Sequence, residues 1–336
     1  MLLEFDADQR LWQQTVRDAV AKQCPPSLVR SVAEDDGDQT PLWEGLWKSY
    51  VDQGWTELND PAGAVELAIV LEELGRATDP TPFLATMSQF APLAADRFDP
   101  HESGTAVYGG IAAHRDADGW VLHGTARHVL DGDRVDRLAV STDAGVFVVA
   151  ANQVSARRSA VFDPVLHVAD LSFADVRVPD TARLTVDAER AHHVALTGMA
   201  ITMVGACQRV LDLVLEHVRN RQQFGAPIGS FQAVQHKAAD MHVAVERARA
   251  LAYFAALTIA EDDPRRRLAA AMAKASAGEC QSLVFRHGLQ LFGAMGFTWE
   301  NDLQFALKRA KAGELMLGGA AEHRARIAEE YRAADF

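Results

Sequence analysis

The segment from Arg219 to Met241 constrains the fold of this 336-residue chain more than any other. It reads RNRQQFGAPIGSFQAVQHKAADM. A helical pattern of apolar residues ends here in a basic, amide-rich turn, a Gly-Ala-Pro-Ile-Gly connection follows, and a second helical pattern begins. Gly225 and Gly229 allow the backbone to reverse within a few residues. The segment therefore predicts two long helices that are joined by a tight hairpin.

Composition and charge narrow the class of protein. The chain has 33 Lys and Arg against 46 Asp and Glu, a formal net charge of −13, which argues against a nucleic-acid or anionic-membrane partner because both need a basic face. Cys24, Cys207 and Cys280 have no spacing typical of a metal site or a disulfide framework. The N-terminus is acidic where a signal peptide is basic, and the longest nearly uncharged run, 194–207, is too short to cross a bilayer. We expect a cytoplasmic protein without a metal site.

The chain has three compositional zones. Residues 1–103 repeat apolar side chains at helical spacing and predict an N-terminal helical domain. Residues 104–186 carry short apolar runs between turns such as Asp118-Gly119 and Asp131-Gly132, which predict a small antiparallel β domain. Residues 187–336 return to long, alanine-rich helical patterns and predict a C-terminal four-helix bundle. The expected fold class is α+β and mostly α.

Arg221, Gln223 and Phe224 form the chemically distinctive part of the turn. A guanidinium binds a pyrophosphate through charge-assisted, forked hydrogen bonds that contribute about 1.5–3 kcal/mol each. The amide of Gln223 adds a donor, and the ring of Phe224 can cover the edge of a flavin or an adenine. The alternative interpretation is an arginine-rich helix end that is stabilised by the helix dipole alone.

The residues after this turn, Pro-Ile-x-x-Phe-Gln-x-Val-Gln at 227–235, resemble the helix-turn-helix signature of acyl-CoA dehydrogenases position by position. The turn of that family contacts FAD bound to the neighbouring subunit. The resemblance therefore implies that Arg221, Gln223 and Phe224 bind FAD held by another subunit. The order of helices, β unit and long helices also resembles the family.

A second motif, QLFGAMGF at 290–297, resembles the family's Gln-x-x-Gly-Gly-x-Gly-Phe/Tyr segment. In the family this segment ends a long helix and approaches the adenosine part of the same FAD. The resemblance implies this role for Gln290, Phe292 and Gly293. Ala294 departs from the pattern, because a second glycine is expected there, and a glycine that simply ends a helix is the alternative.

The catalytic glutamate of the family has no counterpart in the sequence. The family carries this base in a Tyr-Glu-Gly-Thr-like turn or, in some members, on the helix before the signature turn. Alignment of Gly318 with the family's glycine puts Leu317 at the first position, and counting back from Gly205 puts Ala195 at the second. Neither side chain accepts a proton, so no catalytic residue is expected in this chain. The nearest acid, Glu314, is one helical turn away and is expected to be a solvated acid at a helix end.

The segments that hold the flavin ring in the family are also missing. The family has Thr-Glu-Pro-x-x-Gly-Ser-Asp before its β unit, where this chain has only Ser-Gly-Thr-Ala at 103–106. It has Trp-Ile/Phe-Thr/Ser within the β unit, where this chain has His-Val-Leu at 128–130. His128 is able to hydrogen-bond a ligand, but a single histidine beside a turn more often has a structural role.

These gains and losses follow one pattern. The chain keeps the elements that act on a neighbour's FAD and lacks those that act on its own. It resembles the shorter subunits of the α2β2 acyl-CoA dehydrogenases of bacterial steroid catabolism, which also carry a Leu-Gly-Gly-x-x-x-His-Arg turn, here Leu317 to Arg324. The resemblance implies a larger catalytic subunit as partner, with FAD shared between the two.

The implied reaction is the α,β-dehydrogenation of an acyl-CoA, possibly steroid-derived, that is bound in the partner. A base removes the α-proton, a hydride passes to the flavin, and electrons leave through an electron-transfer flavoprotein. Two alternatives stay open at this point. One is a self-sufficient homo-oligomeric enzyme that uses a displaced acid such as Glu314, and the other is a flavin-free structural or acyl-CoA-binding protein.

Overall fold

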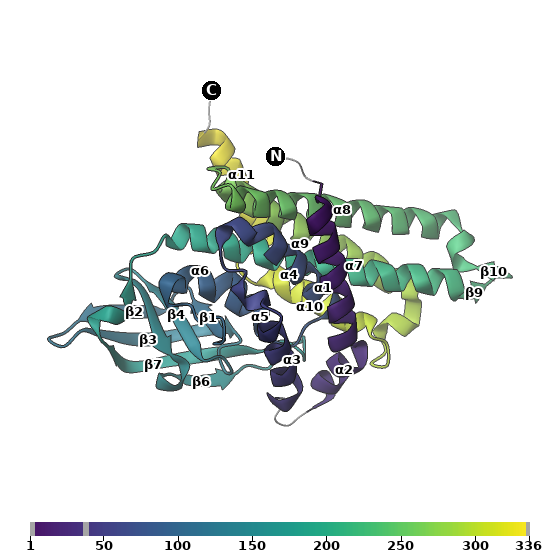
Figure 1. Cartoon of the computed structure of the whole chain (residues 1–336). Coiled ribbons are helices and arrows are strands. Elements are labelled where there is room, and N and C mark those ends of the chain that lie inside the picture. Colours follow the sequence, from purple (N-terminus) through teal and green to yellow (C-terminus); the bar gives the residue numbers. More distant parts are fainter. Residues whose placement is uncertain (1–3, 36–39, 334–336) are drawn as a thin grey trace. The chain divides into compact units, whose positions relative to one another are not determined.

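The structure, a computed structural model, describes residues 4–35 and 40–333 and contains two compact units. The first unit falls within Met1–Ala33, Pro61–Asp79 and Leu196–Phe336, and the second within Glu34–Asp60 and Pro80–Ala195. Helices dominate the first unit, and two sheets with short helices form the second (Figure 1). The fold class expected from the sequence, α+β and mostly α, is therefore confirmed. The division into domains at 103/104 and 186/187 stays a prediction.

Long helices build the first unit. They are α7 (Ala188–Asn220), whose first turns lie in the second unit, α8 (Gln232–Ala260), α9 (Arg266–Phe292), α10 (Leu303–Leu315) and α11 (Ala320–Ala333). Their shared core is lined by small and β-branched side chains such as Val210, Val214, Val245 and Val284. Helix α7 is long and apolar enough to cross a membrane, but 83% of its most apolar window is buried inside the protein, as in the core helix of a soluble fold.

Three N-terminal helices complete this unit: α1 (Ala7–Gln23), α2 (Pro26–Glu34) and α4 (Ala64–Ala77). The side chain of Asp6 accepts from the backbone N–H of Gln9 and so caps α1. Helix α4 lies directly against α7, because a Cβ at Gly75 or Gly205 would overlap backbone atoms of the other helix. The two glycines therefore set the distance between these helices.

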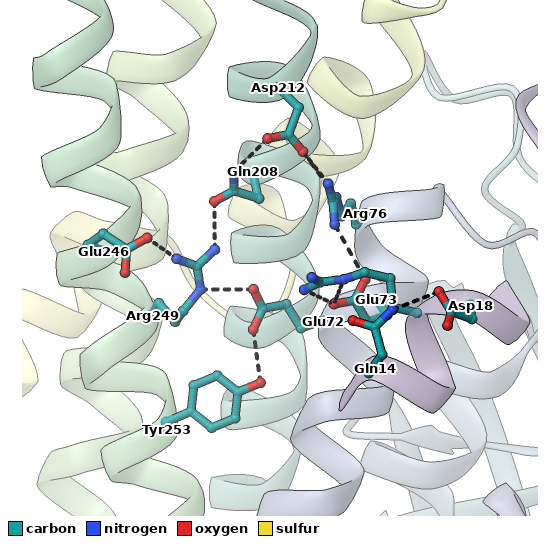
Figure 2. A network of polar contacts seen from close by, with 11 residues as sticks. Gln14, Asp18, Glu72, Glu73, Arg76, Gln208, Asp212, Glu246, Arg249 and Tyr253 are labelled. Atoms are coloured by element: carbon teal, nitrogen blue, oxygen red, sulfur yellow. Dashed lines mark hydrogen bonds and ion pairs between the residues drawn. The ribbon is translucent and has the colours of Figure 1, made fainter. Parts of the chain in front are cut away.

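A polar network fastens α1, α4, α7 and α8 together (Figure 2). Buried Glu72 of α4 accepts from Arg249 at 2.9 Å and from the hydroxyl of Tyr253 at 2.9 Å. Its neighbour Glu73 accepts two hydrogen bonds from Arg17 of α1, at 2.7 and 3.0 Å. Because each buried carboxylate pairs with a guanidinium, the negative charges of the two acids are neutralised inside the helical unit.

Two four-stranded sheets form the β part of the second unit. Their strand orders are β1-β4-β5-β8 and β2-β3-β7-β6. The strands are β1 (Gly104–Val107), β2 (Ile111–Arg115), β3 (Trp120–Leu130), β4 (Arg137–Thr142), β5 (Gly145–Ala150), β6 (Ser155–Arg158), β7 (Val168–Val178) and β8 (Arg183–Leu184). Both sheets contribute to one apolar core, with Leu122 and Leu171 from one and Leu138 and Phe147 from the other.

Two details of the β unit differ from the expectation. The unit is not wholly antiparallel, because β1 pairs with β4 in parallel. Asp118-Gly119 does form a hairpin turn, between β2 and β3, but Asp131-Gly132 does not, since β3 and β4 belong to different sheets. The Asp131 side chain explains this difference, because it is buried and pairs with Arg134 at 2.5 Å. The turn at Asp131 therefore leads the chain from one sheet into the other.

Short helices complete the second unit. Helix α3 (Thr40–Asp52) is followed by a run of short pieces: α5 (Phe83–Ala85), the π-helical η3 (Thr86–Phe90) and α6 (Ala91–Ala94). The ring of Phe90 packs against Gly104 at the start of β1 so closely that a Cβ there would overlap it. The hydroxyl of Thr86 also accepts from the backbone N–H of Gly104 at 3.1 Å. These contacts fix the entry into the β unit.

Candidate functional site

The turn after α7 is a two-residue hairpin. Strands β9 (Gln222–Gln223) and β10 (Ala226–Pro227) pair across Phe224 and Gly225. Both turn residues have positive φ, 53° and 82°, which is the backbone of a type I′ turn. Phe224 is 93% exposed, and Arg221 and Gln223 are exposed beside it. The hairpin therefore presents all three residues expected to bind FAD on its outer surface.

The hairpin is held firmly to the helices on both sides. The backbone N–H of Ile228 donates to the carbonyl of Arg221 at 2.9 Å and closes the hairpin base. Gly229 lies against α7, since a Cβ there would come within 3.0 Å of the Val218 carbonyl. The amide of Gln235 on α8 donates to the carbonyl of Gly229 at 3.1 Å. The position of the turn is therefore set by α7 and α8 and not by its own short strands.

The second motif ends α9. Phe292 is the last helical residue, and Gly293 follows with φ 61°, a conformation that favours glycine. Gln290 is exposed in the last turn of this helix. A Cβ added at Gly293 would meet no atom within 4 Å, so the backbone at this helix end is open to a ligand.

One aromatic contact brings the two motifs together. The imidazole of His217, in the last turn of α7, stacks on the ring of Phe292, with centroids 4.4 Å apart and an interplanar angle of 15°. Partial burial and then the nearby Arg221 guanidinium lower the pKa of His217 below its ordinary value. The sequence analysis missed His217. Its position one turn before Arg221 places it on the same helix face, but nothing in the sequence pairs it with Phe292.

The arrangement fits the phosphate-bearing half of a flavin dinucleotide. Within residues 4–35 and 40–333, Arg221 has no carboxylate or carbonyl partner, so its forked donors are available to a phosphate. Gln223 supplies a further exposed donor. The open backbone at Gly293 leaves room for a planar group beside it. The stack of His217 on Phe292 joins the ends of α7 and α9 that carry these groups.

The residues that align with the family's ring-binding segments make contacts within the second unit. The hydroxyl and backbone N–H of Ser103 both donate to the Asp136 carboxylate, at 2.7 and 2.8 Å, and Gly104 is covered by Phe90. His128 sits in a β-bulge with φ 57°, and its backbone N–H donates to Asp170 at 3.3 Å. His128 is therefore the residue at which strand β3 bulges, and its imidazole is exposed there.

The two positions that the sequence aligns with the family's base, Ala195 and Leu317, hold apolar side chains. Ala195 is fully buried inside α7. Leu317 lies in the turn between α10 and α11 with φ 55°, an uncommon conformation for a non-glycine residue. Its carbonyl is 2.8 Å from Nε2 of the fully buried His323. Lys274 of α9 is also fully buried, and its ammonium donates to the Gly318 carbonyl at 2.7 Å.

Glu314 does not behave as the solvated acid that the sequence suggested. Its Oε1 accepts from the backbone N–H of Ala320 at 2.9 Å and so caps the start of α11. Its Oε2 is buried without a hydrogen-bond partner in the described part of the chain, over Gly278, where a Cβ would overlap it. Burial lowers the pKa of Lys274 to about 8, while Glu314 and Glu322 oppose that change. The expectation of a solvated acid was wrong because the turn folds back over the carboxylate.

No metal chemistry is indicated by the described residues. Across 4–35 and 40–333, no group of three His, Cys, Asp or Glu side chains is arranged to hold a metal ion. Cys24, Cys207 and Cys280 are buried free thiols. The chemistry available at the hairpin is recognition of a phosphate by Arg221 and of a planar ring by Phe224.

The chain resembles known families and proteins over most of its length. The family model described as "Acyl-CoA dehydrogenase, C-terminal domain" matches residues 186–331. The chain is 30% identical over 339 residues to "Acyl-CoA dehydrogenase IpdE2" of Mycolicibacterium smegmatis, and the match covers 96% of this chain and 98% of that protein. The match with IpdE2 therefore spans nearly the whole of both proteins.

Solved structures share the whole fold. The crystal structure of the ChsE4-ChsE5 complex from Mycobacterium tuberculosis contains a chain with a TM-score of 0.87 and 24% identity, over 99% of each chain. The "Tcur3481-Tcur3483 steroid ACAD G363A variant" has a TM-score of 0.84 and 25% identity, over 98% of this chain and 99% of that one.

Proposed function

We propose that this chain, which belongs to the acyl-CoA dehydrogenase family, is the non-catalytic subunit of a heteromeric FAD-dependent acyl-CoA dehydrogenase. Its role is to complete the FAD site of a larger, catalytic subunit. The complex introduces an α,β double bond into an acyl-CoA, and an electron-transfer flavoprotein takes the electrons. The proposed location is the cytoplasm.

One observation carries this proposal. The exposed hairpin with Arg221 and the open helix end at Gly293 belong to helices that the stack of His217 on Phe292 joins, and we assign this surface to the FAD of a partner. The positions that the sequence aligns with the family's base are Leu317 and Ala195, whose side chains cannot accept a proton. A surface built for a flavin without a base beside it suits a subunit that acts on its neighbour's cofactor.

The proposed roles of the residues follow from their chemistry. Arg221 binds the pyrophosphate through its forked N–H groups, and Gln223 donates a further hydrogen bond. Phe224 covers an apolar edge of the cofactor. Phe292 and Gly293 let the backbone at the end of α9 approach the adenosine part, with Gln290 as donor or acceptor. FAD supplies the hydride acceptor when it is bound, and the partner supplies the base and the acyl-CoA pocket.

The names of related proteins support a heteromeric assembly and a steroid-derived substrate. One structural neighbour is a complex of two differently named proteins, and another is a steroid acyl-CoA dehydrogenase named as a pair. The Leu-Gly-Gly-x-x-x-His-Arg turn at 317–324 points the same way. We therefore propose an α2β2 complex that acts on a steroid-derived acyl-CoA.

The alternative of a self-sufficient enzyme with Glu314 as a displaced base is disfavoured by the surroundings of that carboxylate. Glu314 already caps α11 through Oε1, and its other oxygen is buried. A proton acceptor must lie within hydrogen-bond reach of the substrate. A carboxylate that is committed to its own turn does not meet this requirement.

The test is the activity of the chain alone and together with its partner. The purified chain, with and without added FAD, is assayed against a panel of acyl-CoAs with an artificial electron acceptor. We expect no turnover and little bound flavin from the chain alone, and turnover after co-expression with a catalytic subunit. Robust turnover by the chain alone would overturn the proposal in favour of a self-sufficient enzyme. A co-purified complex without FAD would favour a flavin-free role.

A further inference from the structure

A cavity that the proposed function does not use lies within the helical unit. Its volume is about 430 Å³, which is within the range of small-molecule sites. Helices α1, α2, α4, α7 and α10 enclose it. The FAD-facing hairpin and the Leu317 turn contribute no residue to its lining. The cavity is therefore a separate feature of the fold.

The interior of this cavity is apolar. Val20, Cys24, Val29, Phe305 and Ala306 line it, and each of them is buried. The thiol does not change this character, because burial raises the pKa of Cys24 well above its ordinary value and keeps it neutral. Such a lining binds the hydrocarbon part of a ligand by removing apolar surface from water.

Arginines surround the cavity, and two of them are already neutralised. Arg17 gives both of its hydrogen bonds to Glu73, and Arg76 donates to Asp212 at 2.6 and 3.0 Å. Figure 2 shows Arg76 between Glu73 and Asp212 as part of the polar network. These two cations are therefore held by the protein's own carboxylates.

Arg209 is different from these two. It lies on α7, is half-buried, and lines the same cavity. Within residues 4–35 and 40–333 it has no carboxylate or carbonyl partner, although its neighbour Gln208 belongs to the network. A partly desolvated guanidinium without a counter-charge is costly unless an anion binds it. The cavity therefore offers one uncompensated positive charge above an apolar pocket.

The acids that line the cavity limit the anion to a single charge. Glu73 is occupied by Arg17, and Asp302 pairs with Arg30 at 2.5 Å. Asp18 is exposed, and among the described residues its carboxylate accepts from the Gln14 amide alone, at 2.8 Å. A dianionic phosphate would bring more negative charge than Arg209 neutralises, next to these carboxylates. A monocarboxylate meets the guanidinium fork with matched charge and geometry.

From this combination we infer that the cavity is a second ligand site, which binds an amphiphilic monocarboxylate such as a medium-chain fatty acid. The carboxylate pairs with Arg209, and the hydrocarbon chain lies among Val20, Val29 and Phe305. A bound ligand bridges α1, α2 and α10 and stabilises the folded chain by mass action.

The experiment measures binding of octanoate to the full-length chain by calorimetry, with octan-1-ol and octylamine as matched probes. We expect one octanoate per chain and clearly weaker binding of the alcohol and the amine. Arg209→Gln should weaken octanoate binding about 10- to 100-fold, the effect of one lost charge-assisted contact. Arg286→Gln, which removes an exposed positive charge from α9, should leave it unchanged. Ala21→Leu should weaken it by filling the cavity without a change of charge.

Three results would overturn the inference. These are equal affinity in the wild type and Arg209→Gln, no binding of octanoate at all, and octylamine binding as well as octanoate. The last result would assign recognition to Asp18. Melting temperatures of the unliganded variants separate loss of the site from loss of the fold. Because no catalytic turnover is measured, the outcome is independent of the proposed dehydrogenase role.

Discussion

The imidazole of His217 stacks on the ring of Phe292 at a centroid distance of 4.4 Å, although the two residues are 75 positions apart in the sequence. It fixes the last turn of α7 against the last turn of α9. Arg221 follows the joined end of α7, and the open backbone at Gly293 follows the joined end of α9. The predictions below test this surface and the turn at Leu317.

The pKa of His217 should report the position of Arg221. We expect the histidine to titrate below its ordinary value in the folded chain, because burial and the neighbouring cation disfavour the charged imidazole. Arg221→Gln should raise that pKa, whereas Arg219→Gln on the same helix should change it less. Histidine-selective isotope labelling and NMR titration measure the shift. Equal effects of the two substitutions would show that Arg221 is not the close cation.

Removal of Arg221 should lower the FAD content of the co-expressed complex without separating the subunits. A lost charge-assisted contact costs about 1.5–3 kcal/mol, or roughly ten- to a hundred-fold in affinity. We therefore expect Arg221→Ala to lose flavin on dilution, Gln290→Ala to lose less, and Arg219→Ala to match the wild type. Flavin absorbance per complex is the measurement. An unchanged flavin content in Arg221→Ala would mean that Arg221 does not bind FAD and that the turn is an ordinary basic helix end.

Leu317→Glu should not make the chain an active enzyme on its own. The substitution supplies a carboxylate at the position aligned with the family's base, but in the proposed division of roles the segment around Ser103, which donates to Asp136, does not hold a flavin ring. We expect no acyl-CoA turnover by this variant alone with added FAD. Activity comparable to that of the partnered complex would mean that only the base was missing.

The proposed loss of the ring site predicts the stoichiometry of the proposed complex. We expect two copies of this chain, two catalytic subunits and two FAD. Of the four flavin positions in the family's homotetramer, the two that would use this chain's β unit should stay empty. Light scattering gives the mass, and absorbance gives the flavin count. Four FAD per tetramer would contradict the division of roles proposed for the subunits.

Lys274 should give the folded chain a recognisable pH dependence. Burial lowers its pKa to about 8 from an ordinary value of 10.5. Between these values the unfolded chain holds a proton that the folded chain has released, so the free energy of unfolding should rise with pH across this window, by about 2–3 kcal/mol. Denaturant unfolding of the wild type and of Lys274→Met, compared from pH 7.5 to 10.5, isolates this contribution. Parallel curves for the two proteins would show that Lys274 is not desolvated.

The local features of this protein could be predicted from its sequence. Period and turn chemistry are short-range properties, so they were sufficient to predict the long helices on both sides of Arg221 and most strands of the β unit. The apolar residues at 195 and 317 were also evident, because the identity of a side chain needs no structure. The family itself followed from the motifs at 219–241 and 290–297.

Only the tertiary structure decided which distant groups meet. The stack of His217 on Phe292, the burial of Lys274 under Gly318 and the inward turn of Glu314 depend on how helices pack. The sequence predicted a hairpin at Asp131-Gly132, but burial and pairing of Asp131 with Arg134 overrode the turn propensity. The availability of Arg209 likewise depends on which carboxylates the other arginines reach. Period and propensity describe neighbours along the chain, whereas charge compensation and burial are set by neighbours in space.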